Sequence, residues 1–268
     1  MDSLKRNDLL KDWLSRKLKI DFSISSASSD ASFRRYFRVK TVKDTFIVMD
    51  APPENESIEA FVKIGQILTT INVNVPDIFE EDNALGFILM QDFGSDTYLD
   101  VLNDDNQQRL YSDSIESLIQ MQKLVKKDLC QSYTQKILFD EMSLFIEWYL
   151  KKYKKIELTN KENEKLLSCF ETISKKALSQ EKFFVHRDYH SRNLMNKKLN
   201  NPGILDFQDA LVGPVTYDLV SLLKDAYIEW DEEIVLDHVV RYWEKAKMNN
   251  LITNLEFSTF YKDFECMG

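Results

Sequence analysis

The spacing of apolar side chains divides the chain into a strand-rich first part and a mostly helical second part. Apolar residues near the start recur at helical spacing, and the period then shortens to two, which is typical of half-buried strands. The elements expected in the first part are a helix over residues 3–19, strands over 33–40 and 45–49, a helix over 57–70, and two short strands around a turn at 82–83.

After Asp92 the helical period dominates, and one β segment interrupts it. Residues 183–195 and 202–210 flank the turn-forming sequence Asn-Asn-Pro-Gly and predict a hairpin. The helices expected here cover 96–103, 105–127, 135–154 and 161–178, with a further series from about residue 216 to the end. The whole pattern predicts an α+β fold with a small β-rich lobe over 1–90 and a larger helical lobe over 91–268.

Composition and charge exclude several classes of function. The chain has 268 residues and a net charge of −9, which argues against a protein that binds the phosphate backbone of a nucleic acid. Its three cysteines lie far apart, so they indicate reduced thiols and neither a disulfide framework nor a thiolate zinc site. The start is charged and no apolar run approaches the length of a membrane span. We expect a cytoplasmic protein that is not embedded in a membrane; its oligomeric state is left open.

The six glycines exclude the commonest phosphate-binding loops. No GxxxxGK[ST] segment can be written from them, which excludes a Walker-type loop. No GxGxxG segment can be written either, which excludes the dinucleotide fingerprint and the usual glycine-rich loop of protein kinases. If this chain binds a phosphate group, a different structural feature must hold it.

A kinase-like catalytic motif lies in the β segment of the second part. Residues 186–193 read HRDYHSRN, which matches the pattern H-R-D-x-x-x-x-N at every specified position. Thirteen residues after Asn193, Asp206 follows an apolar strand. If the two arms of the hairpin pair, Asn193 and Asp206 supply hard oxygen ligands to one Mg²⁺. Asp188 is the expected base that accepts the proton of an attacking hydroxyl, and His186 is expected to anchor the loop.

The segment has two other interpretations. The same residues could form an ordinary hydrogen-bonded loop that contacts no substrate, but the joint match with a downstream aspartate favours phosphoryl transfer. Alternatively, His186, Asp188 and His190 alternate along the chain and could offer three ligands to a catalytic zinc ion. Because His238 is the only other histidine, a metallohydrolase is the weaker hypothesis.

Longer segments carry a resemblance to a known family. The chain resembles the aminoglycoside phosphotransferase/choline kinase-like family, whose members have a protein-kinase-like fold, and within it the bacterial anomeric sugar kinases that act on N-acetylmuramate and N-acetylglucosamine. The segments that carry the resemblance span residues 29 to 268: SDASFRRYFRV, IVMDAPPE, VPDIFEEDNALGFILMQDFG, HRDYHSRNLM, PGILDFQDALVGPVTYDLVSLLKDAYIEW and FYKDFECMG.

The resemblance implies roles for further residues. The turn over the nucleotide phosphates would be formed by Ser29, Asp30, Ala31, Ser32 and Phe33. Met90 would line the adenine pocket, and the backbone of Gln91 and Phe93 would bind the adenine edge. Asp218 would brace the catalytic loop. Alternatively, its carboxylate would only stabilise the first turn of the helix in which it lies. Asp209 and Glu147 would accept hydrogen bonds from sugar hydroxyls, although Glu147 also fits a solvated helix position.

The expected substrate class is inferred from the family resemblance and not from the charge of the chain. Arg187 and Arg192 flank the expected base and could favour an anionic acceptor, or they could form salt bridges within the loop. We expect an ATP- and Mg²⁺-dependent kinase of the anomeric C1 hydroxyl of N-acetylmuramate or N-acetylglucosamine, in the recycling of cell-wall sugars. The alternatives are a kinase of an aminoglycoside or a choline-like amine, and a nucleotide-binding module without turnover.

The chain departs from the family pattern at two places. Kinase-like proteins carry a phosphate-binding lysine on the third strand, where this chain has Met49. The family resemblance also implies several dozen further residues after Gly268, so the chain is expected to be a fragment.

Arg34 or Arg35 is expected to supply the charge that Met49 lacks. We therefore predict that Arg34→Ala or Arg35→Ala weakens ATP binding, because one guanidinium would no longer neutralise the phosphates. Titration calorimetry with ATP measures this change. Unchanged affinity in both variants would exclude the hypothesis.

Overall fold

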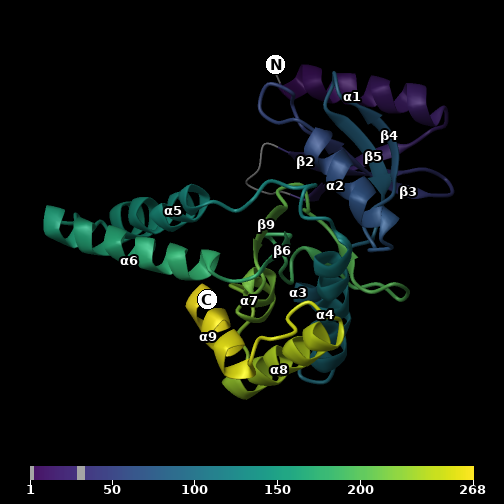
Figure 1. The fold of residues 1–268 in the computed structure, drawn as a ribbon. Coiled ribbons are helices and arrows are strands. Elements are labelled where there is room, and N and C mark those ends of the chain that lie inside the picture. The colour runs from purple at the N-terminus through teal and green to yellow at the C-terminus, as the bar shows by residue number, and fades with distance from the viewer. Residues whose placement is uncertain (1–2, 29–33) are drawn as a thin grey trace. The chain divides into compact units, whose positions relative to one another are not determined.

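The computed structural model describes residues 3–28 and 34–268, and the chain divides into two compact units. The first unit consists of Met1–Ser95 with Lys197–Gln208, and the second consists of Asp96–Asn196 with Asp209–Gly268. Figure 1 labels the elements of both units. The first unit holds a five-stranded sheet and the second holds most of the helices, which confirms the α+β class.

The sheet of the first unit is antiparallel throughout. Its strand order is β1-β2-β3-β5-β4. The strands are β1 (Ser23–Ser28), β2 (Arg35–Lys40), β3 (Thr45–Asp50), β4 (Ile78–Asp82) and β5 (Phe87–Gln91), and the short β8 (Gly203–Ile204) belongs to the same unit. The sequence pattern predicted β2 to β5 but not β1, whose serine-rich SISSAS has low strand propensity. Pairing with β2 makes this segment a strand.

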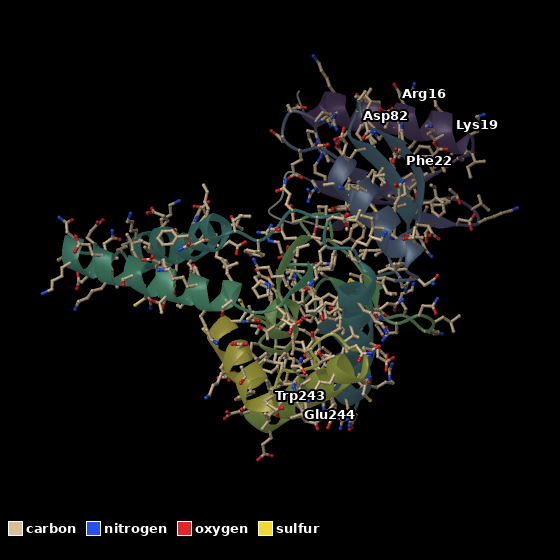
Figure 2. The ribbon with its side chains drawn as sticks, in the orientation of Figure 1. Arg16, Lys19, Phe22, Asp82, Trp243 and Glu244 are labelled. Carbon is tan, nitrogen blue, oxygen red and sulfur yellow. The ribbon has the colours of Figure 1, made fainter. Side chains whose placement is uncertain are left out.

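Helix α1 (Ser3–Leu18) covers one face of the sheet. Its buried side chains Leu10, Trp13 and Leu14 form a core with residues of β2, β3 and β5, among them Phe87. Phe22, labelled in Figure 2, packs against this cluster from the segment after the helix. The predicted helix over 3–19 is therefore confirmed, and its apolar stripe forms the core contact.

Helix α2 (Glu59–Thr70) packs on the segment that carries Asp206. The Phe61 ring lies 4.7 Å from the ring of Phe207, measured between centroids. A Cβ atom added at Gly65 would lie 3.3 Å from the same ring, so this small residue lets the helix approach closely. The contact positions the residue that follows Asp206.

A buried carboxylate ties α1 to two strands of the sheet. Asp50 at the end of β3 is fully buried and accepts hydrogen bonds from Arg6 (2.8 Å) and Arg35 (3.1 Å). Arg6 also donates to the carbonyl of Leu85 at 2.6 Å. Separating Arg35 from Asp50 would leave the buried carboxylate with less compensating charge, which is costly. The ion pair therefore holds Arg35 close to the end of β3.

The second unit is mostly helical. Its helices are α3 (Tyr98–Val101), α4 (Gln107–Leu124), α5 (Gln135–Leu144), η1 (Phe145–Tyr153), α6 (Asn160–Leu178), α7 (Tyr217–Leu223), α8 (Glu232–Met248) and α9 (Phe257–Met267). Figure 1 shows α5 and α6 side by side. The sequence predicted one helix over 135–154, but the hydrogen bonds change to a π-helical pattern at Phe145.

A short β pair leads into residues 186–193, the segment expected to be catalytic (the catalytic segment). Strand β6 (Lys182–Val185) pairs antiparallel with β9 (Leu211–Pro214), which the sequence pattern did not predict, and β7 (Leu194–Met195) follows the motif. A Cβ atom at Gly213 would lie 2.9 Å from the Tyr133 ring, so a glycine allows this tyrosine to lie against β9.

Within the described residues, no helix combines the length and the hydropathy that crossing a lipid bilayer requires.

His238 on α8 is a buried histidine with a hydrogen-bond role. Its Nε2 lies 2.6 Å from the side-chain oxygen of Gln107, and its ring packs edge-on against Tyr111. Burial lowers the pKa of His238 to about 4 from its usual 6.5. On the opposite side of α8, Trp243 (Figure 2) donates its indole N–H to the carbonyl of Leu255 at 2.9 Å. Both contacts fix α8 within the second unit.

We predict that His238→Gln makes the stability of the protein less dependent on pH. Since the folded pKa lies below the unfolded value, the stability that His238 contributes is present above pH 6.5 and lost as the pH falls towards 4. Glutamine keeps a donor for Gln107 but does not titrate. Urea unfolding at several pH values measures the effect, and parallel curves for the two proteins would contradict it.

Candidate active site

The catalytic segment of the second unit is anchored at its start by a buried carboxylate. The backbone N–H groups of His186 and Arg187 donate to the two carboxyl oxygens of Asp218, at 2.7 and 3.0 Å. Asp218 lies in the first turn of α7 and is fully buried. Burial raises its pKa to about 7, although the two N–H donors act in the opposite direction. The carboxylate thus holds the backbone that leads directly into Asp188.

A second aspartate, which sequence reasoning missed, anchors the middle of the segment. Asp225 accepts hydrogen bonds from the N–H groups of Ser191 (2.9 Å) and Tyr227 (3.0 Å). Tyr189 is also buried and donates its hydroxyl to the carbonyl of Ser114 at 2.8 Å. Nothing in the sequence separates Asp225 from the chain's other aspartates, because its partner lies 34 residues away. The segment is therefore held by α7, by the loop that follows α7, and by α4.

Asp188 and Asn193 are half-buried and linked to one another. The side-chain amide of Asn193 donates to the backbone carbonyl of Asp188 at 3.0 Å. This orientation leaves the amide oxygen as the atom for a cation. Asn193 therefore presents one hard oxygen atom, the ligand type that Mg²⁺ prefers.

Asp206 belongs to the first unit. It has a left-handed backbone conformation (φ 61°), and its carboxylate accepts a hydrogen bond from Gln208 at 2.7 Å. The expectation that Asp206 and Asn193 bind one Mg²⁺ beside the base Asp188 stays a prediction.

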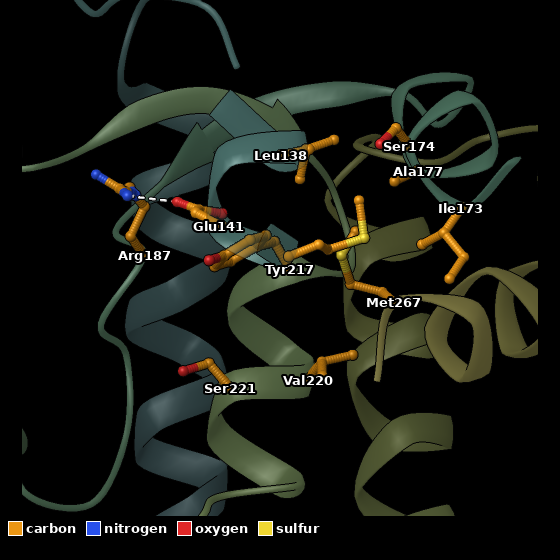
Figure 3. Close-up of a pocket in the computed structure, with 11 residues that line it drawn as sticks. Leu138, Glu141, Ile173, Ser174, Ala177, Arg187, Tyr217, Val220, Ser221 and Met267 are labelled. Atoms are coloured by element: carbon orange, nitrogen blue, oxygen red, sulfur yellow. Dashed lines mark hydrogen bonds and ion pairs between the residues drawn. The ribbon is translucent and has the colours of Figure 1, made fainter. Parts of the chain in front are cut away.

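Arg187 faces a polar cluster that the motif alone did not indicate. Its guanidinium forms an ion pair with Glu141 of α5 at 2.5 Å, drawn as a dashed line in Figure 3. Glu141 also accepts a hydrogen bond from the Tyr133 hydroxyl, which lies 3.2 Å from that of Tyr217. Burial alone would lower the pKa of Arg187, but the charge and hydrogen bond of Glu141 raise it above its usual value.

The other expected substrate contacts are exposed. Glu147 lies on η1 and pairs with Lys151 at 2.6 Å. Arg192 stacks over the Tyr227 ring at 5.0 Å, and Asp209 is exposed on the surface. Their roles toward a substrate stay predictions.

The expected nucleotide residues lie in the first unit. Met49 and Met90 are buried on β3 and β5. The N–H of Gln91 donates to the Asp77 carbonyl at 2.8 Å, so an adenine contact at Gln91 would fall on its carbonyl oxygen. The carbonyl of Phe93 accepts a hydrogen bond from Lys197 at 3.2 Å.

The two arginines expected to bind the nucleotide phosphates both form ion pairs with acidic side chains. Arg34 forms an ion pair with Glu56 at 2.6 Å, and Arg35 pairs with the buried Asp50. The predicted phosphate turn, Ser29, Asp30, Ala31, Ser32 and Phe33, lies outside the described residues.

Across residues 3–28 and 34–268, no three His, Cys, Asp or Glu side chains gather in a way that could hold a metal ion. His186, Asp188 and His190 therefore do not form the zinc site that the alternative hypothesis requires.

Known proteins resemble the chain over most of its length. The model of the phosphotransferase enzyme family matches residues 23–251. The N-acetylmuramate/N-acetylglucosamine kinase of Neisseria meningitidis serogroup B is 40% identical over 271 residues, which cover 99% of this chain and 80% of the relative. The protein of the same name from Pseudomonas aeruginosa is 41% identical over 242 residues, covering 90% and 71%.

Among solved structures, aminoglycoside phosphotransferase APH(2'')-Ib with bound ADP superposes with a TM-score of 0.65 at 17% identity, covering 100% of this chain and 97% of that one. This likeness shows a shared fold and confirms the protein-kinase-like architecture that the resemblance implied.

We predict that Asp218→Asn destabilises the protein. The amide group would turn a donor toward one of the two buried N–H groups, which costs about 1–3 kcal/mol of unfolding free energy. Urea unfolding at pH 8 measures the loss. The matched control is Asp237→Asn, the same change at an exposed aspartate of α8. Equal stability of both variants would show that the anchor contributes nothing.

Proposed function

Because the chain belongs to the phosphotransferase enzyme family, we propose that it transfers the γ-phosphoryl group of ATP to a hydroxyl of N-acetylmuramate or N-acetylglucosamine. The observation that carries the proposal is the 40% identity, over 99% of the chain, to a relative named for these two sugars. The acceptor is proposed to be the anomeric C1 hydroxyl, in the recycling of cell-wall sugars. The enzyme is proposed to act in the cytoplasm on small molecules alone.

The anchored segment suits a reaction that depends on positioning. Phosphoryl transfer needs an acceptor hydroxyl in line with the γ-phosphorus and a base within hydrogen-bond reach of its proton. Asp188 would be that base, since it lies in a backbone held at both sides by Asp218 and Asp225. His186 is buried and would support the loop without touching the substrate. These hydrogen bonds restrain the backbone on both sides of Asp188.

Asn193 and Asp206 would hold the magnesium ion. Both offer hard oxygen atoms, and the Asn193 amide already turns its nitrogen to the Asp188 carbonyl. When bound, Mg²⁺ neutralises the charge on the β- and γ-phosphates. The nucleotide would lie against Met90, Gln91 and Phe93 of the first unit.

We predict that Asp188→Asn lowers turnover by about 10²–10⁴-fold, as expected for loss of a general base. ADP release measured by a coupled assay, with N-acetylmuramate, N-acetylglucosamine, an aminoglycoside and choline as acceptors, tests both the residue and the substrate class. Asp237→Asn on exposed α8 is the matched control and should keep parental turnover. Equal rates in the Asp188 variant and the parent, or turnover with the aminoglycoside or choline alone, would refute the proposal.

A further inference from the structure

The second unit contains a cavity of about 300 Å³, and Arg187, the residue before the expected base, is one of the residues that line it. Figure 3 shows its lining, which comes from α5, α6, α7, α9 and the catalytic segment. Arg187 and Glu141 are its charged residues; the apolar ones are Leu138, Met142, Ile173, Ala177, Val220 and Met267. Arg187 directly precedes Asp188, and adjacent Cα atoms are about 3.8 Å apart. A ligand held by Arg187 would therefore be bound by the residue that directly precedes the expected base.

The backbone at Arg187 indicates that its side chain is needed there. Its φ of 79° lies in the left-handed region, which costs a residue with a side chain of order 1 kcal/mol or more. Glycine would adopt this conformation without strain. An arginine in this place is therefore expected to serve an interaction that a glycine cannot provide.

The polar groups of the cavity are only partly satisfied by one another. Arg187 uses Nη2 for the ion pair with Glu141, while its Nε is buried and has no hydrogen-bond partner in the described part of the chain. Glu141 accepts from Arg187 and Tyr133, one bond on each oxygen, and a carboxylate accepts about four. The cavity thus has at least one buried, unused donor, the Nε–H of Arg187, and a carboxylate with unused acceptor positions. Buried polar atoms without partners are uncommon in proteins, and a ligand would explain this one.

We propose that this cavity, the acetamido pocket, binds the N-acetyl group of the acceptor sugar. The inference rests on the proposed function and names the part of the substrate that is recognised. The acetyl carbonyl accepts from Arg187, the amide N–H donates to Glu141, and the methyl group packs against Met142, Ala177 and Met267. A small rotation of the arginine side chain turns its Nε–H toward the ligand.

The charge of the pocket favours a neutral amide over a cation. Because Glu141 is already paired with Arg187, the cavity offers no unbalanced negative charge to an aminoglycoside or a quaternary amine. An amide, in contrast, has one donor and one acceptor that match the unused groups. Both sugars of the proposed function carry this group, so one pocket would serve both.

The first test compares N-acetylglucosamine with glucosamine, which lacks the acetyl group. The kcat/KM of Arg187→Gly and Glu141→Gln for N-acetylglucosamine should fall about 10- to 100-fold, the effect of losing a hydrogen bond to a charged group. Their kcat/KM for glucosamine should change far less. Arg187→Gly also relieves the strained φ, so its melting temperature reports whether folding is intact. Equal losses for both sugars would mean a merely structural role and overturn the proposal.

The second test narrows the pocket. Ala177 is buried in α6, and Ala177→Met would fill part of the cavity. Across N-acetyl-, N-propionyl- and N-butyrylglucosamine, this variant should lose kcat/KM in order of acyl length. A uniform loss across the series would contradict acyl binding at this place.

A binding measurement separates this inference from the proposed function. Saturation-transfer NMR follows the acetyl methyl signal of N-acetylglucosamine without turnover. A methyl signal that weakens in Arg187→Gly supports the pocket, even if no sugar is phosphorylated and the proposed function fails. A methyl signal of equal strength in parent and variant overturns the pocket, whatever the kinase assay shows.

Discussion

The pair of hydrogen bonds from the backbone of the catalytic segment to Asp218 is the interaction on which the site depends. The catalytic segment follows β6 and, within the described parts of the chain, has no neighbouring strand to accept hydrogen bonds from its backbone. Its N–H groups therefore need other acceptors. Asp218 satisfies two of them from the first turn of α7, and Asp225 satisfies a third. Each carboxylate is buried in the second unit, where these hydrogen bonds compete little with water. The phosphotransferase therefore positions its expected base through backbone contacts.

One residue of this segment, Arg187, is held through both its backbone and its side chain. Arg187 has its N–H on Asp218 and its guanidinium on Glu141 of α5. Tyr133, held close to β9 by the absence of a side chain at Gly213, donates to the same glutamate. A change in any member of this cluster would therefore reach the backbone next to Asp188. The expected base and the proposed acceptor pocket would thus depend on the same contacts.

The first unit achieves rigidity by a different device. Asp50 stands directly after Met49, the position where kinase-like proteins carry lysine, and it binds Arg6 and Arg35 in the core between α1 and the sheet. Asp92, after β5, accepts two hydrogen bonds from Arg38 and one from the Gly94 N–H. Although burial opposes them, these donors hold the pKa of Asp92 below its usual range. Arginine–aspartate pairs thus link β2 to the end of β3 and to the residue that follows β5.

The sequence by itself determined the elements whose own periodicity is strong. The apolar stripe of α1, the alternation in β2 and the eight-residue motif at 186–193 are local patterns, and each predicted its structure or chemistry without knowledge of its partners. The catalytic-loop hypothesis and the fold class came from these signals.

Only the tertiary structure decided the features that depend on distant partners. The serines of β1 form a strand because β2 lies beside them, and the change at Phe145 from α to π hydrogen bonding has no signal in the apolar spacing. Glu141 and Asp225 reach the catalytic segment across 46 and 34 residues. A single carboxylate leaves no periodic pattern in the sequence. Its hydrogen-bond partner is set by tertiary packing, so its role becomes clear only in the folded chain.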